Sequence, residues 1–578
     1  MNDYCSSERN IQILIEILKA NNIHKVVASP GATDVSLNIS LQHDPWFEIY
    51  SEVDERGAAY LACGLSAESQ EPVVITCTGA TSSRNYMPGL TEAYYRKIPI
   101  LAVTCSRNNA FVGQLVDQVT DRTNPPHDTV IVSVQAQAVR NELDEWDVVN
   151  KINTAVLGLS HNGGGPCHIN LETLYQGDYS IKNIPPVRCV KRYMHNDKLP
   201  AIEQGVRVGV FVGAHEKWSD ELTAVLTEFC RIYDGVVLCD HTSNYKGEYR
   251  VHFPLLFDQI DSDKGLSDFD LVIHIGYISN YQCKFTNVWR VNPDGELRNT
   301  FGKLKAVFQM SEMEFFTHYI HGRSGDNHKS LRNWQLRIEK AISIIPELPF
   351  SNIWVAQQLS SKLPKGCVLH MGIRNSIRSW NYFDIDDSIL GYCNTGGFGI
   401  DGGISSLVGA SFCNPQKLYF GVFGDLLFFY NMNAIGNRSI KPNVRILIIN
   451  NGLGQEFRNY MCNSAALGEE ANLFVAAQGH YGNRNPNAIK GFAEAVGFRY
   501  IKASSKEEFA IAAPDFVNPV IGDQPVIFEV FTEQKDESEA VETINKLSNK
   551  AKMLKGVKDI LARPEMSVVK NIAKNIVK

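Results

Sequence analysis

Short, almost wholly apolar segments alternate with segments of helical periodicity in the first third of the chain. The apolar segments, which we expect to be strands, lie at 25–29, 72–77, 99–105 and 168–172. Apolar side chains recur at helical spacing in residues 8–21, 55–67 and 84–96. Strands that are apolar on both faces and separated by helices indicate a parallel sheet covered by helices on both sides.

The same alternation continues through the rest of the chain, with breaks at the proline-containing stretches 182–192 and 345–352. Further strands are expected at 206–214, 235–240, 270–276, 288–292, 366–372, 417–425, 444–452, 498–503 and 525–531. We therefore predict an α/β protein of three doubly wound parallel-sheet domains, with the first and third alike. The predicted limits are 1–183, 190–345 and 350–535, followed by a charged helical tail at 536–578.

Composition excludes several classes of protein. The 578 residues are too many for one hydrophobic core. The net charge of -7, without a basic stripe, argues against a nucleic-acid partner. No signal peptide is recognisable, and no apolar run approaches the ~18 residues that cross a bilayer. The 13 cysteines are scattered without a CxxC pair, which favours a reducing, cytoplasmic location.

The strongest chemical signal consists of two polar strand ends joined by one helix. Asp425 lies at the end of the expected strand at 417–425, and Asn451 lies at the end of the next one, at 444–452. The carboxyl ends of parallel strands share one edge of a sheet, where ligands bind. Carboxylate and amide oxygens suit Mg²⁺, which completes its shell with phosphate and water, so a diphosphate is the expected partner. Alternatively, Asp425 only caps a helix and Asn450-Asn451-Gly452 is only a turn.

In order and composition, these residues resemble the metal and diphosphate motif of thiamine-diphosphate-dependent enzymes. Leu426 stands where the common G-D-G form has glycine, but GDLLFFYNMNAI and NNGLGQEF resemble one branch, the SEPHCHC synthase of menaquinone biosynthesis. The resemblance implies that Asp425 and Asn451 bind the metal through their side chains and Leu453 through its carbonyl. It also places Gly424 and Leu426 beside the cofactor.

In the first domain, EVDERGAAYLACGLS (52–66) resembles the family segment that supplies a glutamate, and Glu55 is the matching residue. In the family, this carboxyl hydrogen-bonds N1′ of the aminopyrimidine and favours the imino form, which can remove the C2 proton of the thiazolium. The protein supplies position and proton control, while the cofactor carries the electrons. The alternative for Glu55 is an acid in a first helical turn that interacts with the helix dipole.

Three further segments match the family in order and spacing: SPGATDVS (29–36), TCTGATSSRNYMPGLTEA (76–93) and NTGGFGIDGG (394–403). The resemblance assigns these residues to the cofactor: Thr78, Gly79, Gly399 and Ile400. The Ile400 side chain would support the bent shape of thiamine. A glycine-rich turn before a helix also allows a phosphate to approach the helix N-terminus.

The substrate pocket departs from this branch at two positions. SEPHCHC synthase decarboxylates 2-oxoglutarate and adds the product to isochorismate, and such carboxylate-rich substrates favour arginine. Thr33, beside Ala32, and Thr395 each stand where the branch has arginine. Each lost contact of this kind costs about 1.5–3 kcal/mol, which argues for a different substrate. Arg107 and Gln118 keep the spacing of the branch, and the resemblance assigns Gln118 to catalysis as well as to substrate binding.

The sequence therefore predicts a thiamine-diphosphate- and Mg²⁺-dependent carboligase. It would decarboxylate a 2-oxo acid and transfer the acyl or aldehyde unit to a carbonyl or alkene acceptor, with Arg374 and Arg378 as candidate donors to a carboxylate. A simple decarboxylase that releases an aldehyde and a non-catalytic scaffold remain alternatives. The family builds its site from the first domain of one subunit and the third domain of another. The resemblance thus implies a homodimer or homotetramer with shared active sites.

Overall fold

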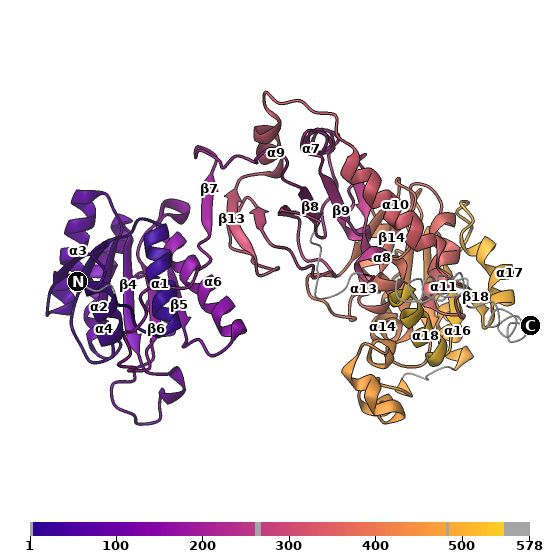
Figure 1. Cartoon of the computed structure of the whole chain (residues 1–578). Coiled ribbons are helices and arrows are strands. Elements are labelled where there is room, and N and C mark those ends of the chain that lie inside the picture. The colour runs from indigo at the N-terminus through magenta and orange to yellow at the C-terminus, as the bar shows by residue number, and fades with distance from the viewer. Residues whose placement is uncertain (1–3, 260–267, 481–484, 548–578) are drawn as a thin grey trace, which may run out of the picture. The chain divides into compact units, whose positions relative to one another are not determined.

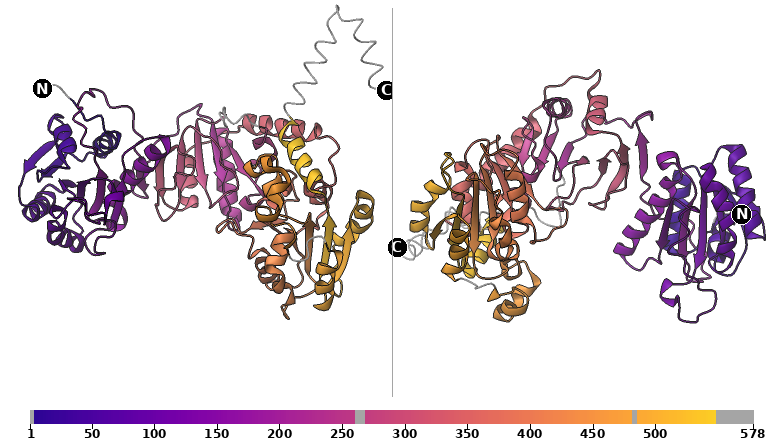
Figure 2. Two further views of the ribbon diagram at one scale, coloured as in Figure 1. Left: turned by 90° about the horizontal axis from the view of Figure 1, so that it is seen from below. Right: turned by 180° about the vertical axis from the view of Figure 1, so that it is seen from behind.

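The computed structural model of the chain describes residues 4–259, 268–480 and 485–547 (Figures 1 and 2). It divides into two compact units, Met1–Pro200 with Asn287–Ser311, and Ala201–Thr286 with Glu312–Lys578. Within these units the strands form parallel sheets between helices, so the predicted fold class is confirmed. The exact domain limits stay a prediction.

The first domain contains a six-stranded sheet in the order β2-β1-β3-β4-β6-β5. Its strands are β1 (Lys25–Ala28), β2 (Glu48–Ser51), β3 (Val73–Thr78), β4 (Ile100–Ser106), β5 (Val132–Ala136) and β6 (Cys167–Glu172). Its helices are α1 (Arg9–Ala20), α2 (Val35–Gln42), α3 (Glu55–Ser69), α4 (Ser82–Asn85), α5 (Met87–Arg96) and α6 (Glu142–Gly158).

Two separate apolar clusters cover the two faces of this sheet. One joins α1 and α6 to the sheet, and the other joins α3 and α5 to it (Figure 1). Successive side chains of β3 and β4 alternate between the two clusters. Both strands are therefore buried on both faces and have largely apolar sequences. The Asn141 side chain caps α6 by accepting the N–H groups of Leu143 and Asp144, which fixes where that helix begins.

Strands of the predicted central domain belong to both compact units. The second unit contains the order β10-β9-β8-β11, formed by β8 (Val208–Val212), β9 (Val236–Cys239), β10 (Arg250–His252) and β11 (Leu271–Ile275). The first unit contains β12 (Val288–Val291), β13 (Leu304–Gln309) and β7 (Lys191–Met194), in the order β12-β13-β7. The end of the expected linker at 182–192 is thus a strand, because Lys191 and Arg192 pair with β13.

Helices of this region are α7 (Asp220–Tyr233), α8 (Pro254–Phe257), α9 (Glu312–Ile320) and α10 (Lys329–Ser343). The Ser219 hydroxyl caps α7 by accepting the N–H of Leu222, and Asp220 and Glu221 in the first turn favour the same start. Asp234 ends α7 in the left-handed conformation.

The third domain repeats the strand pattern of the first, in the order β15-β14-β16-β17-β19-β18. Its strands are β14 (Val368–Met371), β15 (Leu390–Cys393), β16 (Tyr419–Gly424), β17 (Val444–Asn450), β18 (Arg499–Ala503) and β19 (Val526–Phe531). Its helices are α11 (Asn352–Leu359), α12 (Asn375–Trp380), α13 (Gly403–Ser411), α14 (Asp425–Asn431), α15 (Ala471–Phe474), α16 (Pro486–Ala495), α17 (Lys506–Phe516) and α18 (Gln534–Asn545). The predicted likeness of the first and third domains is confirmed by this shared strand order.

The predicted helical tail is helical in α18, and its remainder from residue 548 lies outside the described residues. Across residues 4–259, 268–480 and 485–547, no helix has the length and apolar character needed to cross a membrane. The cytoplasmic location stays a prediction.

Glu537 of α18 is fully buried, and its Oε1 accepts the Asn352 N–H at 2.9 Å and the Thr532 hydroxyl at 2.7 Å. Burial raises the pKa of Glu537 from 4.5 to about 7. An acid with a raised pKa contributes stability below its unfolded pKa, and this contribution is lost as the pH rises through the folded value.

The Glu537→Gln variant keeps the Oε1 acceptor. As the pH rises from 5 to 8, we expect its free energy of unfolding to fall less than that of the wild type. The difference should reach about 3 kcal/mol, because each pKa unit corresponds to about 1.4 kcal/mol. Chemical unfolding at a series of pH values measures it. Glu539→Gln, on the exposed side of α18, is the matched control. Parallel pH profiles for the wild type and Glu537→Gln would contradict the expectation.

Candidate functional site

The two polar strand ends predicted from the sequence lie side by side. Strands β16 and β17 are parallel neighbours, with Gly424 opposite Ile449. Asp425 is the first residue of α14, directly after β16, and Asn451 directly follows β17. The Gly452 N–H donates to Asp425 Oδ2 at 3.1 Å. Both side chains therefore occupy the carboxyl edge of the sheet, where open α/β folds bind ligands.

The donor set at this edge fits a divalent cation. Asp425 is 3% exposed and Asn451 is 8% exposed. Burial raises the pKa of Asp425 to about 7, which shows how poorly the protein alone stabilises this carboxylate. Among the described residues, none donates a hydrogen bond to the buried Asn451 Oδ1. A bound cation would satisfy both oxygens, and Leu453 follows, buried, in the same loop.

Of the two alternatives to metal binding at these residues, the turn is present and the helix cap by Asp425 is not. Gly452 has a φ of +79°, so Asn450-Asn451-Gly452 is a turn that requires glycine. The N-cap of α14, however, is Gly424, and Asp425 is instead a first-turn acid. A turn at this position is compatible with ligand binding, because it aims the loop at the sheet edge.

The glycine-rich segment before α13 lies in the same domain. Ile400 is half-buried and packs against the core cluster that includes Phe423 and Leu427. A Cβ at Gly399 would lie 2.4 Å from Asp401 Oδ1, so the chain is close to itself here. Thr395 is buried, Leu426 is half-buried, and the Asn431 Oδ1 accepts the Ser405 N–H at 2.8 Å, which ties α13 to α14.

In the first unit, Glu55 is half-buried in the first turn of α3, and Asp54 is the N-cap. The Asn85 amide, at the end of α4, donates to Glu55 Oε2 at 3.2 Å. Glu55 thus occupies the position expected of a helix-dipole acid, and a second element also holds its carboxylate. That restraint suits a group that must present its other oxygen to a ligand.

Thr33, Thr78 and Gly79 lie close together around the end of β4. The Thr33 hydroxyl donates to the Cys105 carbonyl at 2.6 Å, and the Thr33 N–H donates to Thr78 Oγ1 at 3.3 Å. A Cβ at Gly79 would lie 2.7 Å from the Cys105 carbonyl oxygen, so only glycine fits. The hydroxyl that replaces the arginine of the branch is therefore engaged with the main chain and buried.

Two charged residues here were missed by the sequence analysis. Asp34 is buried, it accepts hydrogen bonds from the Gly31 N–H and the Asn38 amide, and burial raises its pKa to about 6. Arg122 is buried beside Gly79, whose carbonyl it hydrogen-bonds. Asp34 precedes a helix and so resembles an ordinary cap in the sequence. Only the fold shows that each of the two is enclosed.

The remaining substrate candidates are more exposed. Arg107 forms two hydrogen bonds with Asp117, at 3.1 and 3.0 Å. Gln118 is exposed with a φ of +56°, and Ala32 is also exposed.

The two arginines suggested as a carboxylate clamp differ from one another. Arg378 is paired through two hydrogen bonds of 2.7 and 2.8 Å with Glu456. Arg374 stacks over the Phe398 ring, with its guanidinium carbon 5.0 Å from the ring centroid. Only Arg374 therefore has a guanidinium that is not committed to a carboxylate of the described chain, and its role in substrate binding stays a prediction.

Comparisons with known proteins agree with this chemistry. Residues 10–125 match the family model described as the thiamine pyrophosphate enzyme, N-terminal TPP binding domain. The chain is 29% identical to the 2-succinyl-5-enolpyruvyl-6-hydroxy-3-cyclohexene-1-carboxylate synthase of Bacteroides thetaiotaomicron, over 92% of this chain and 97% of the relative. It is also 29% identical to the synthase of that name from Phocaeicola vulgatus, over 94% of this chain and 99% of that relative.

Among solved structures, the chain is similar to the thiamine diphosphate-dependent 4-hydroxybenzoylformate decarboxylase of Rhodococcus jostii RHA1. The sequence identity is 16% and the TM-score is 0.38, over 91% of this chain and 99% of that one. The fold assignment rests on the strand orders of the chain itself.

Proposed function

We propose that this chain, which belongs to the thiamine-diphosphate-dependent enzymes, uses thiamine diphosphate and Mg²⁺ to decarboxylate a 2-oxo acid and transfer the acyl unit to a carbonyl or alkene acceptor. When bound, the cofactor supplies the electron sink for cleaving and forming bonds next to a carbonyl. One observation carries the proposal: the Asp425 carboxylate and the unpartnered Asn451 Oδ1 share one sheet edge.

Each residue has a defined task in this proposal. Asp425 and Asn451 hold the metal through side-chain oxygens, and Leu453 contributes its carbonyl. Magnesium uses few protein oxygens, so diphosphate and water complete its shell. Glu55, restrained by Asn85, holds the proton at N1′ of the aminopyrimidine.

The substrate proposed here differs from that of the relatives. The relatives are named as synthases of a cyclohexene carboxylate. The SEPHCHC branch has arginine where this chain has Thr33 and Thr395. The buried Thr33 hydroxyl bonds to the main chain and offers no cationic group. Without that guanidinium, bidentate recognition of a carboxylate at this position is lost. This supports the same transfer chemistry with a less carboxylate-rich donor or acceptor.

Shared active sites are part of the proposal because apolar side chains are exposed beside both halves of the site. Val53, 76% exposed, and Tyr60 flank Glu55, while Phe474 is 96% exposed in α15. The segment after α15 contacts the loop that contains Asn451 and Leu453, since the Gly454 N–H donates to the Ala476 carbonyl at 2.6 Å. Exposed apolar side chains beside a functional site favour coverage by a partner. We propose a homodimer, or a tetramer of two such dimers, in which Glu55 of one subunit serves Asp425 of another.

Product analysis tests the reaction. The enzyme with thiamine diphosphate and Mg²⁺ is incubated with pyruvate or 2-oxoglutarate, with and without acceptor aldehydes or keto sugars, and products are identified by mass spectrometry. We expect CO₂ release accompanied by a new C–C-bonded product only where an acceptor is present. Glu55→Gln protein in the same mixtures controls for uncatalysed reaction. Free aldehyde as the only product in every mixture would identify a simple decarboxylase instead.

A further inference from the structure

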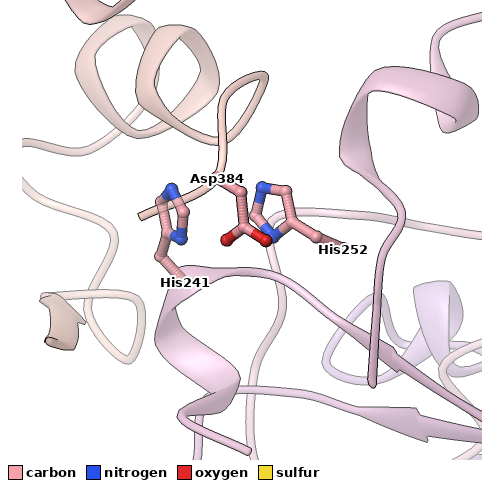
Figure 3. A group of neighbouring side chains, drawn as sticks. All are labelled: His241, His252 and Asp384. Atoms are coloured by element: carbon pink, nitrogen blue, oxygen red, sulfur yellow. The ribbon is translucent and has the colours of Figure 1, made fainter. Parts of the chain in front are cut away.

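Two histidines and an aspartate from distant parts of the sequence converge in the second compact unit (Figure 3). His241 follows β9 and begins a short 3₁₀ turn, His252 ends β10, and Asp384 lies between α12 and β15. One candidate ligand atom from each side chain lies within 4.8 Å of the others. The cluster joins the central strands of this unit to its third domain.

The main chain fixes which nitrogen of each imidazole carries the proton. His241 Nε2 lies 3.0 Å from the carbonyl oxygens of Trp380 and Phe383. His252 Nε2 lies 2.7 Å from the carbonyl oxygen of Asn381. A carbonyl only accepts, so each Nε2 is the donor and each Nδ1 keeps its lone pair. Metal-binding histidines are commonly oriented through a carbonyl in this way.

The two Nδ1 atoms are buried acceptors that remain unsatisfied. Within the described part of the chain, neither has a hydrogen-bond partner. Both histidines are buried, and burial lowers the pKa of His252 to about 4 and holds that of His241 well below its usual range. Both rings are therefore neutral, the form that binds a metal. The Asp384 carboxylate offers an oxygen within 4.8 Å of a nitrogen of each ring, and Figure 3 shows the three side chains together.

Asp384 supplies the oxygen of this cluster. Its two carboxylate oxygens accept hydrogen bonds of 2.7 Å from the Arg250 guanidinium, and its side chain is 49% exposed. Oδ1 also accepts the Ile385 N–H at 2.9 Å, so Oδ2 is the oxygen that keeps a lone pair beyond the one that faces Arg250. Arg250 thus orients the carboxylate as an outer partner orients a metal ligand, and solvent reaches the cluster from the side of Asp384.

We propose that His241 Nδ1, His252 Nδ1 and one Asp384 oxygen bind a Zn²⁺ ion, at a site separate from the metal proposed at Asp425. Two imidazole nitrogens and one carboxylate oxygen, with a fourth position open to water, are a common zinc ligand set. The bound ion would fix the loop around 380–384 to the ends of β9 and β10.

Binding requires the imidazole rings to rotate, because a metal lies in the plane of each imidazole that binds it. The imidazole rings stack with centroids 4.5 Å apart and planes 22° apart. The ligand atoms of a tetrahedral zinc site lie roughly 3.3 Å apart, given metal–ligand bonds of about 2.0–2.1 Å. The nearby positive charges of Arg250 and Lys246 oppose the ion, and the negative charges of Asp384 and Asp387 favour it.

Zinc titration of the tag-free full chain tests the site. The protein is stripped with EDTA, kept free of Mg²⁺ and thiamine diphosphate, and titrated calorimetrically with Zn²⁺. We expect one ion per chain and a higher Tm. Asp384→Asn should lower the affinity at least tenfold, whereas Asp387→Asn, a more exposed neighbour of Arg250, should have a much smaller effect. His252→Asn should also lose binding, with circular dichroism to verify folding. Equal affinity for Asp384→Asn and the wild type would overturn the proposal.

Two further measurements test whether the zinc binds instead to any of the thirteen cysteines or to the proposed Mg²⁺ site. X-ray absorption of the zinc-loaded protein should show nitrogen and oxygen ligands only, and sulfur in the first coordination shell would overturn the assignment. Asp425→Ala should bind Zn²⁺ as the wild type does. Loss of zinc in Asp425→Ala would place the ion at the other site and end this proposal, without contradicting the proposed function.

Discussion

We expect Glu55→Gln to lower turnover by about 10²–10⁴-fold, the range that positioned acid–base groups contribute. The amide keeps the size of the carboxyl and an oxygen that can accept the Asn85 hydrogen bond. It cannot, however, hold and release a proton at N1′. Binding of thiamine diphosphate should therefore change little, because the residues proposed to hold the metal and the diphosphate lie in the third domain. Steady-state kinetics and calorimetric titration of the cofactor measure the two quantities separately.

Glu52→Gln is the matched control for this variant. Glu52 lies three residues before Glu55, ahead of α3. Its Oε1 accepts the Asp54 N–H at 3.1 Å, a bond that glutamine can keep. We expect near-normal turnover from this control. Equal turnover of Glu55→Gln and the wild type would refute the proton-transfer role, and equal losses in the two variants would indicate a purely structural effect.

We expect Asp425→Ala to abolish the Mg²⁺-dependent binding of thiamine diphosphate. In the wild type, cofactor at about 100 times its dissociation constant should raise the free energy of unfolding by roughly 2.7 kcal/mol. The variant should show no such increase, because the charged ligand at the sheet edge is gone and Asn451 cannot hold the metal alone. Thermal unfolding with and without cofactor and Mg²⁺ measures the shift.

Asp523→Ala, at an exposed position of the same domain, should keep the full shift. Near-normal cofactor affinity in Asp425→Ala would refute the metal role of this residue. Mixed, refolded subunits of Glu55→Gln and Asp425→Ala provide a joint control. If sites are shared between subunits, a mixed dimer contains one intact pair of Glu55 and Asp425, and part of the activity returns. Continued inactivity of verified mixed dimers would contradict the shared site.

The strands that were predictable from the sequence are those buried on both faces. Strands β3, β4, β16 and β17 are continuous apolar runs, and each was located to within a few residues. The missed strands lie mostly at edges. β2 is exposed along its whole length and β5 is mostly half-buried, as is β7, while β10 and β15 are short. An edge strand buries little and so lacks the apolar signature. β13, next to β7, is an exception that mixes Lys305 and Gln309 with apolar residues.

The candidate site divides along similar lines. The adjacency of Asp425 and Asn451 followed from chain order, since parallel strand ends share an edge. The resemblance to thiamine-diphosphate-dependent enzymes, predicted from the same motif, is confirmed by the comparisons. What sequence order could not supply is enclosure: Asp34 resembles a helix cap until its burial is known. His241 and Asp384 are too distant in the chain for any local spacing to connect them.

The shared strand order of the first and third domains makes β3 the counterpart of β16, and β4 the counterpart of β17. The position of Asp425, just after β16, then corresponds to Gly79 after β3. Likewise, Asn451 after β17 corresponds to Arg107 after β4. In the third domain this sheet edge carries a carboxylate and an amide oxygen, and in the first domain the equivalent edge carries a guanidinium. The same strand order thus presents opposite charge at the equivalent edges of the two domains.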